Sequence, residues 1–153
     1  MIELDISFEN DEIKESVEQD DVSIVVERVL NYLELDNCEL SLSFVSKESM
    51  RVLNEQYRNK NESTDVLSFA QQDDDEQFFK SEGLTLLGDI VISLDDMQAN
   101  CEIFNVSFDE ELKRLIVHGI LHLVGEDHTS NNDDEPMLQR QEEIMKFLLK
   151  GSD

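Results

Sequence analysis

All three histidines of this 153-residue chain fall in one short stretch, HGILHLVGEDH at residues 118–128. His118 and His122 are four positions apart, so on a helix they project from the same side, one turn apart. Gly125 follows the last apolar residues, where helices commonly end in a left-handed conformation, and such a turn brings His128 back toward the other two. Three neutral imidazoles with an open fourth position form the ligand set of a catalytic zinc site. The stretch therefore predicts a site for one metal ion, with zinc expected and nickel, copper or iron as alternatives.

Two other interpretations of the stretch have to be weighed. The first is that these are ordinary histidines of a helix with no metal-binding role. That is the usual explanation for a single histidine, but not for three at spacings of four and six. A metallopeptidase is the other, because H-x-x-x-H-x-x-G-x-x-H is the ligand spacing of the metzincins, which carry Glu directly after the first histidine as the general base. Gly119 stands at that position here and has no proton acceptor. The sequence disfavours a peptidase unless another carboxylate takes that role.

The elements that must position these residues follow from hydrophobic periodicity. Alternating apolar residues predict strands over 2–8, 39–45, 65–70 and 84–93. Helical spacing predicts helices over 21–34, 47–58, from Ser93 onward, over 108–124, and from Pro136 to about Lys150. This order predicts an α/β (α+β) fold in one domain over residues 1–153, a four-stranded sheet with about five helices around a metal cleft. The short link between the third and fourth strands favours an antiparallel pair, and hence a mixed sheet.

Local signals add detail to these elements. Asp20 or Asp21 is expected to cap the first helix, and Ser107 with Glu110 forms a capping box. Gly88 inside an apolar strand indicates a bulge or a close backbone approach. The acidic stretch at residues 71–83 has no clear period and is expected to be a loop.

Composition limits the class of protein. The chain carries 12 Lys and Arg against 37 Asp and Glu, a net charge of −25, which argues against general affinity for phosphate backbones. Its two cysteines, Cys38 and Cys101, are far apart, as expected in a reducing cytosol. No apolar run approaches the roughly 18 residues of a membrane span, and no secretory signal is visible. We expect a soluble cytoplasmic protein without a membrane partner.

Three blocks of the sequence resemble the YbeY family of bacterial rRNA maturation factors. The family pattern H-G-x-L-H-L-x-G-x-D-H matches residues 118–128, LNEQYRNKNESTDVLSFA at 53–70 is similar to a second block, and LGDIVIS at 87–93 to a third. These blocks follow in the family's order and span about half of the chain. Departures are Ser63 and Ala70, where the family usually has proline, and Glu126, where it favours an aromatic residue or histidine.

The resemblance implies a fold, a reaction and a set of site residues. The implied fold is a mixed four-stranded sheet with helices around a metal cleft. The implied activity is that of a zinc-dependent, single-strand-specific endoribonuclease in 3′-end maturation of small-subunit rRNA and in ribosome quality control. Its partners would be single-stranded RNA, the small ribosomal subunit and assembly proteins of that subunit. His118, His122 and His128 would bind zinc, and Arg58 would take part in catalysis by positioning the phosphate.

An RNA substrate requires basic residues in this acidic chain. Residues 47–60 contain Lys47, Arg51, Arg58 and Lys60 against Glu48 and Glu55, a local net charge of +2. Such a patch can contact phosphates while the remaining surface limits non-specific binding. Arg51, Arg58 and Lys60 are therefore candidates for RNA binding, although a solvated helix face explains Lys47 and Arg51 equally well.

Four polar residues near these motifs are candidates to support the site. Thr64, Asp65, Asp89 and Asp127 are expected to fix turns or to hold a ligand histidine by a hydrogen bond. The sequence identifies no general base. A non-catalytic ribosome-assembly factor with a structural zinc is the remaining alternative, but closed structural sites have four protein ligands, and neither cysteine lies in the motif.

Overall fold

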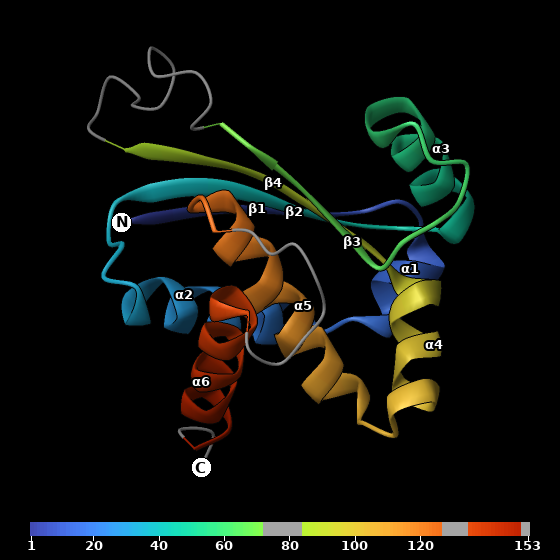
Figure 1. The fold of residues 1–153 in the computed structure, drawn as a ribbon. Coiled ribbons are helices and arrows are strands. Elements are labelled where there is room, and N and C mark those ends of the chain that lie inside the picture. Colours follow the sequence, from blue (N-terminus) through green and yellow to red (C-terminus); the bar gives the residue numbers. More distant parts are fainter. Residues whose placement is uncertain (72–83, 127–134, 151–153) are drawn as a thin grey trace.

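The computed structural model describes residues 1–71, 84–126 and 135–150, and its centre is a four-stranded sheet (Figure 1). The strands are β1 (Ile2–Phe8), β2 (Cys38–Val45), β3 (Val66–Ala70) and β4 (Thr85–Ser93), in the spatial order β1-β2-β4-β3. β1, β2 and β4 are mutually parallel, whereas β3 pairs with β4 in the antiparallel sense. The predicted mixed four-stranded sheet is confirmed, and β3 is an edge strand.

Six helices are present among the described residues, one more than predicted. They are α1 (Asp11–Ser16), α2 (Gln19–Tyr32), α3 (Lys47–Arg58), α4 (Leu94–Phe104), α5 (Phe108–Leu123) and α6 (Pro136–Lys150). Periodicity missed α1 because this short helix buries only Ile13. The predicted cap of α2 is wrong, since Glu18 occupies the N-cap position and makes no side-chain cap bond. Ser107 caps α5 as predicted, accepting from the Glu110 N–H.

Alternation along the strands separates two faces of the sheet. The inner face of β2 carries fully or almost fully buried side chains, namely Cys38, Leu40, Leu42 and Phe44. Helices α2, α5 and α6 lie against this face (Figure 1). α5 is the central helix of the layer, and Ile116 and Ile120 on it are fully buried. The histidine helix is thus fixed by the core rather than carried on a loop.

Two glycines permit close approach between β3, β4 and α5. At Gly88 the backbone has a φ of +133°, and a Cβ atom there would lie 2.1 Å from the carbonyl oxygen of Phe69. A Cβ on Gly119 would lie 2.9 Å from Cγ2 of Ile90. The Ser68 hydroxyl donates to the Gly119 carbonyl at 3.2 Å. The helix turn that bears the histidines therefore packs directly on β3 and β4.

In the part of the chain that the structure describes, no helix is both long enough and apolar enough to cross a membrane.

Candidate metal site and RNA-binding surface

The two described histidines converge on one point beside α5. His118 and His122 lie one turn apart, with ring centroids separated by 4.7 Å and ring planes at 71°. Their Nε2 atoms are 3.2 Å apart. His128 and Asp127 lie outside the described residues. Gly125 has a φ of +99°, which confirms the predicted left-handed end of the helix.

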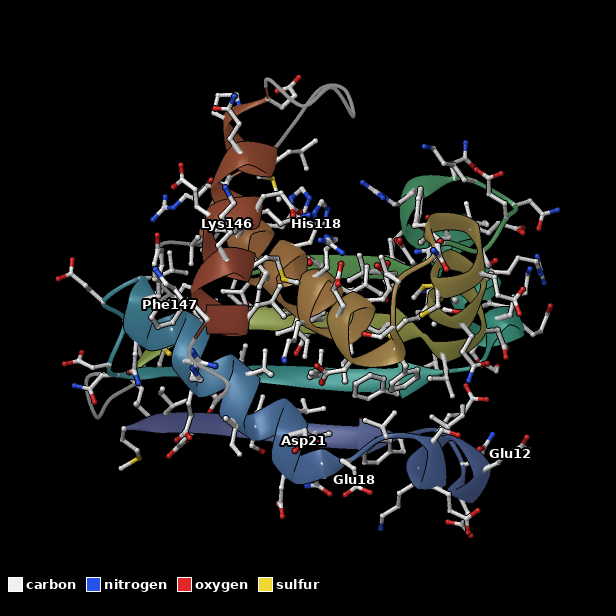
Figure 2. The ribbon with its side chains drawn as sticks, turned by 90° about the horizontal axis from the view of Figure 1, so that it is seen from below. Glu12, Glu18, Asp21, His118, Lys146 and Phe147 are labelled. Carbon is white, nitrogen blue, oxygen red and sulfur yellow. The ribbon has the colours of Figure 1, made fainter. Side chains whose placement is uncertain are left out.

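The other ring nitrogen of His118 is held by α6. Oε1 of Gln141 lies 2.6 Å from Nδ1 of His118, and Gln141 is buried with only 7% of its surface exposed. The Nε2 amide of the same Gln141 donates to Glu142 at 3.3 Å, so its oxygen faces the ring and accepts the Nδ1 proton. In a neutral imidazole the proton on Nδ1 leaves Nε2 as a lone-pair donor. Figure 2 shows His118 projecting from α5 beside α6.

This arrangement fits a metal ion bound by imidazole nitrogen. Zn–N bonds of about 2.0–2.1 Å at a tetrahedral angle separate two ligand nitrogens by about 3.3 Å. The 3.2 Å between the two Nε2 atoms is close to that separation. Among the residues described, no group of three or more His, Cys, Asp or Glu side chains could hold a metal ion. If a metal ion is bound there by three protein ligands, the third would come from outside the described ranges, and His128 is the predicted candidate.

A hollow with a volume of about 1210 Å³ opens beside His118, between α4, α5 and α6. Asp65, Asn100 and Glu111 line it together with His118. Nδ2 of Asn100 donates both to Asp65, at 2.9 Å, and to Glu111, at 3.0 Å. Thr64 extends the group, since its hydroxyl lies 3.5 Å from Asp65 Oδ1. Of the predicted supporting residues, Asp65 thus lines the hollow that contains a predicted ligand, and Thr64 contacts Asp65.

Glu111 is a buried carboxyl in this hollow that the sequence did not single out. Only 4% of its surface is exposed. Burial raises the pKa of Glu111 above its ordinary value, and the charge of Asp65 raises it further, while Asn100 and Arg114 oppose the shift. Glu111 precedes His118 by seven residues, which puts it about 10 Å away along the helix, on the same face. The hollow therefore contains a group able to exchange a proton.

Charged pairs fix α6 against α5 on either side of Gln141. Arg114 donates to both carboxylate oxygens of Glu142 at 3.0 Å and to Glu110 at 3.1 Å. The bond from Arg114 lowers the pKa of Glu142 and raises the pKa of Arg114 itself. Arg140 forms an ion pair with Glu126 at 2.6 Å. Glu126, a departure from the family pattern, therefore ties the end of α5 to α6.

The predicted RNA-binding residues on and after α3 divide into two groups. Arg51 is engaged by Glu48 at 2.8 Å, by Glu55 at 3.0 Å and by Asn61, so it is an ion-paired residue of the helix surface. Arg58 and Lys60 are exposed, and neither side chain has a hydrogen bond or ion pair within the described residues. Within the part of the chain that the structure describes, Arg58 and Lys60 are therefore the members of this group that remain available to phosphate. No described contact joins Arg58 to the histidines.

Asp89 does not lie with the histidines. In β4 it alternates with Gly88 and Ile90, which face α5, and its side chain accepts from the Ser41 hydroxyl at 2.5 Å on the opposite face. There it lines a separate hollow of about 780 Å³ with Glu3 and other acidic residues. A role for Asp89 in holding a ligand histidine is therefore not what the structure shows. The alternation of side chains along β4 was a sequence signal that Asp89 faces away from α5.

The remaining residues that sequence reasoning missed share one property. Gln141 and Asn100 reach the site only through tertiary packing of α6 and α4 on α5, and packing of these elements buries Glu111, which is on the histidine face of α5 itself. Gln141 stands at a buried position of α6, between apolar residues at helical spacing, and a polar residue in such a stripe was the available signal.

Comparisons with known proteins agree with this geometry. The family model described as Endoribonuclease YbeY matches residues 5–149. Three relatives named Endoribonuclease YbeY are similar over most of the chain. The protein of Treponema denticola is 46% identical over 93% of this chain and 90% of its own length. That of Oceanobacillus iheyensis is 38% identical over 85% and 89%, and that of Halalkalibacterium halodurans is 48% identical over 70% of each.

A solved structure supports the fold. The solution structure of a protein from Thermotoga maritima superposes with a TM-score of 0.62 and covers 96% of this chain and 89% of its own. Its sequence identity is 23%, so the likeness extends to the fold alone.

Proposed function

This chain belongs to the endoribonuclease YbeY family, and on that premise we propose that it is a zinc-dependent endoribonuclease for single-stranded RNA. As a family member it is a hydrolase that acts as an endoribonuclease in rRNA processing. Its proposed substrate is the 3′ end of small-subunit rRNA in the cytoplasm. The small ribosomal subunit and its assembly proteins are the proposed partners, including in ribosome quality control.

The observation that carries the zinc proposal is the paired geometry of His118 and His122. Two Nε2 atoms at 3.2 Å, one of them in a ring whose Nδ1 is bonded to Gln141, present lone pairs to a common point. His118, His122 and His128 would hold the ion, with an open position for water or a phosphate oxygen. Bound there, zinc supplies a Lewis acid for the phosphate and lowers the pKa of a bound water.

The protein's own groups have separate tasks in this proposal. Arg58 would bind a phosphate through its two-pronged guanidinium and offset charge that develops during cleavage. Gln141 holds the ring of His118 in one tautomer. Glu111, whose pKa burial raises, is able to hold or release a proton inside the hollow. No contact assigns it to a reacting atom.

The two alternatives, a metallopeptidase and an assembly factor with a structural zinc, gain no support from the described residues. The metzincin general base would stand at position 119, but Gly119 is buried against Ile90, so a larger side chain there meets the sheet rather than a substrate. A closed structural zinc site would need a fourth protein ligand beside the three histidines, and Cys38 and Cys101 were the candidates. Cys38 is fully buried in β2 and Cys101 contacts the Ser107 carbonyl, and within the described residues neither forms a three-ligand group with the histidines.

Cleavage of an unstructured RNA by the purified protein tests the proposal. We expect Arg58→Ala to lower kcat/KM by about 100-fold or more, because it removes a group that stabilises transition-state charge. His122→Ala should abolish cleavage, whereas Arg51→Ala, the matched control on the same helix, should leave it unchanged. Cleavage that survives both Arg58→Ala and His122→Ala contradicts the assignment.

A further inference from the structure

Tyr57 presents an exposed aromatic ring at the end of α3. The helical pattern put it on the same face as Met50 and Asn54, which are buried, yet Tyr57 is 59% exposed. Its ring packs on Phe69 of β3 with centroids 5.1 Å apart and planes at 66°. This edge-to-face contact holds the ring in a defined orientation and leaves much of its surface open to solvent.

The same turn carries the free cations. Arg58 follows Tyr57 directly and Lys60 lies two residues further, past Asn59, whose left-handed backbone (φ 59°) ends the helix. Neither cation is paired within the described ranges 1–71, 84–126 and 135–150, although the chain has a net charge of −25. Arg51, about two turns earlier in α3, has carboxylate partners on both sides. An aromatic ring beside two unpaired cations is therefore a local feature of this end of α3.

This feature flanks the edge strand that touches the histidine helix. Phe69, which supports Tyr57, follows Ser68, whose hydroxyl binds the carbonyl of Gly119 next to His118. Successive side chains of a strand point to opposite faces, so Tyr57 and the histidines lie on either side of β3. β3 is the last strand of the sheet. A single strand of RNA that passes over that edge would contact both Tyr57 and the histidines.

We propose that Tyr57 is a stacking platform for an unpaired base of the RNA substrate, with Arg58 and Lys60 contacting the adjoining phosphates. Aromatic side chains bind single strands in this way because every base has a π-face, and positive groups follow the backbone. A base inside a duplex has both faces covered by its neighbours, so the subsite selects single strands. This inference rests on the proposed RNA substrate and adds where the strand is bound.

The chain provides an internal control for the aromatic pair itself. Tyr32, the only other tyrosine, packs on Phe147 at 5.0 Å and is 39% exposed. Arg28 beside it is occupied, because it donates to the carbonyls of Phe147 and Leu148 and lies 5.0 Å from the Phe147 ring. That pair joins α2 to α6 (Figure 2 labels Phe147). It has the same ring contact, but the arginine beside it is engaged by backbone carbonyls.

Fluorescence provides the direct test, because the chain contains no tryptophan. A Tyr57→Trp variant is titrated with a short single-stranded oligoadenylate RNA and with the same strand in a duplex; Tyr32→Trp is the control. We expect saturable quenching of the Tyr57→Trp variant by the single strand, much weaker quenching by the duplex, and none in the Tyr32→Trp variant. Equal responses of the two variants overturn the proposal.

Kinetics separate binding from chemistry. Tyr57→Ala should raise the KM for single-stranded RNA by about 5- to 100-fold with little change in kcat or metal content, because a base stack is lost. Tyr57→Phe should retain the wild-type KM, and Tyr32→Ala should not alter it. If the wild-type protein cleaves RNA but Tyr57→Ala leaves KM unchanged, the subsite is wrong and the ribonuclease stands. If single-stranded RNA quenches the Tyr57→Trp variant but the wild type cleaves none, the ribonuclease proposal fails and the subsite stands.

Discussion

At the scale of single residues, the site depends on which nitrogen of His118 faces outward. The bond from Nδ1 to Gln141 decides this, and Nε2 then meets Nε2 of His122 at 3.2 Å. Partners of this kind orient a ligand ring and raise its basicity. Gln141 comes from α6, so correct packing of a second helix is a condition for the metal site.

Gln141→Ala should therefore weaken zinc binding by about 10- to 100-fold, the usual effect of removing such a partner. The measurement is a competition titration of metal-free protein against a zinc chelator. Gln139→Ala, a change of the same type at an exposed position of α6, is the control and should leave the affinity unchanged. Equal zinc affinity in the wild type and Gln141→Ala would contradict the role of this bond.

The close packing of α5 on β4 requires a glycine at position 119. This is also the position at which a metzincin peptidase carries its general base. Gly119→Ala puts a methyl group 2.9 Å from Ile90, and such overpacking costs about 1–3 kcal/mol. Thermal unfolding should show a lower Tm. In an Ile90→Ala background, which removes the contacted atoms, the same substitution should cost much less. Additive effects of the two changes would show that this contact is not the cause.

At the scale of elements, α5 combines core packing with the acid–base groups of the site. Its apolar residues fix it under the sheet, while Glu111 and the histidines share the face that borders the hollow. α3 has a different task, since its last turn and the residues after it supply the unpaired cations. The proposed site would therefore combine a central helix held by the core with a separate basic helix end.

The raised pKa of Glu111 predicts a pH dependence of stability. Burial disfavours the ionised carboxyl, so stability is fully present below the ordinary pKa of 4.5 and is lost as the pH rises through the higher folded-state pKa. Glu111→Gln removes this loss. At neutral pH the Tm of Glu111→Gln should exceed that of the wild type, and this difference in Tm should be smaller at pH values below 4.5. A Tm difference that does not change with pH between these values would contradict the shift.

Binding of single-stranded RNA should depend on salt through Arg58 and Lys60. Each phosphate contact contributes about 0.7 to the slope of log K against log of salt concentration for a single strand. Arg58→Ala and Lys60→Ala should each reduce the slope by about that amount, measured by anisotropy at several salt concentrations. Arg51→Ala should not change it, because carboxylates already neutralise Arg51. If Arg51→Ala reduced the slope of log K against log salt as much as Arg58→Ala does, the assignment of phosphate binding to Arg58 and not to Arg51 would be wrong.

At the scale of the whole molecule, the sequence predicted most of the fold and only part of the site. Alternation predicted the four strands to within a residue or two, and the short link predicted the antiparallel edge. α1 escaped because six residues with one buried side chain carry little periodicity. Gln141 escaped because packing of α6 on α5, which spacing along the chain does not contain, brings it to His118. Glu111 shares the face of His118 at a spacing of seven, but its burial follows from tertiary packing and was not visible in the sequence. The partner that Asp89 needs is Ser41 on the face of the sheet opposite α5, which the alternation of β4 indicates and its apolar surroundings alone do not.

The strong negative charge has a physical counterpart in the structure. Acidic side chains line the outer hollow of the sheet, whereas the unpaired Arg58 and Lys60 adjoin the edge strand β3. A mainly acidic surface with a local basic group limits non-specific binding and favours binding of a strand at that group. The net charge of −25 is therefore compatible with an RNA substrate that binds at one place.

The most direct test of the account is cleavage of single-stranded RNA by the same protein sample before zinc removal, after it, and after zinc is returned. The account predicts about one zinc ion per chain, loss of cleavage on chelation and recovery when zinc is added back. His122→Ala should bind little zinc and should not recover. Undiminished cleavage by the metal-free protein would contradict the central claim that the paired histidines hold the ion on which RNA cleavage depends.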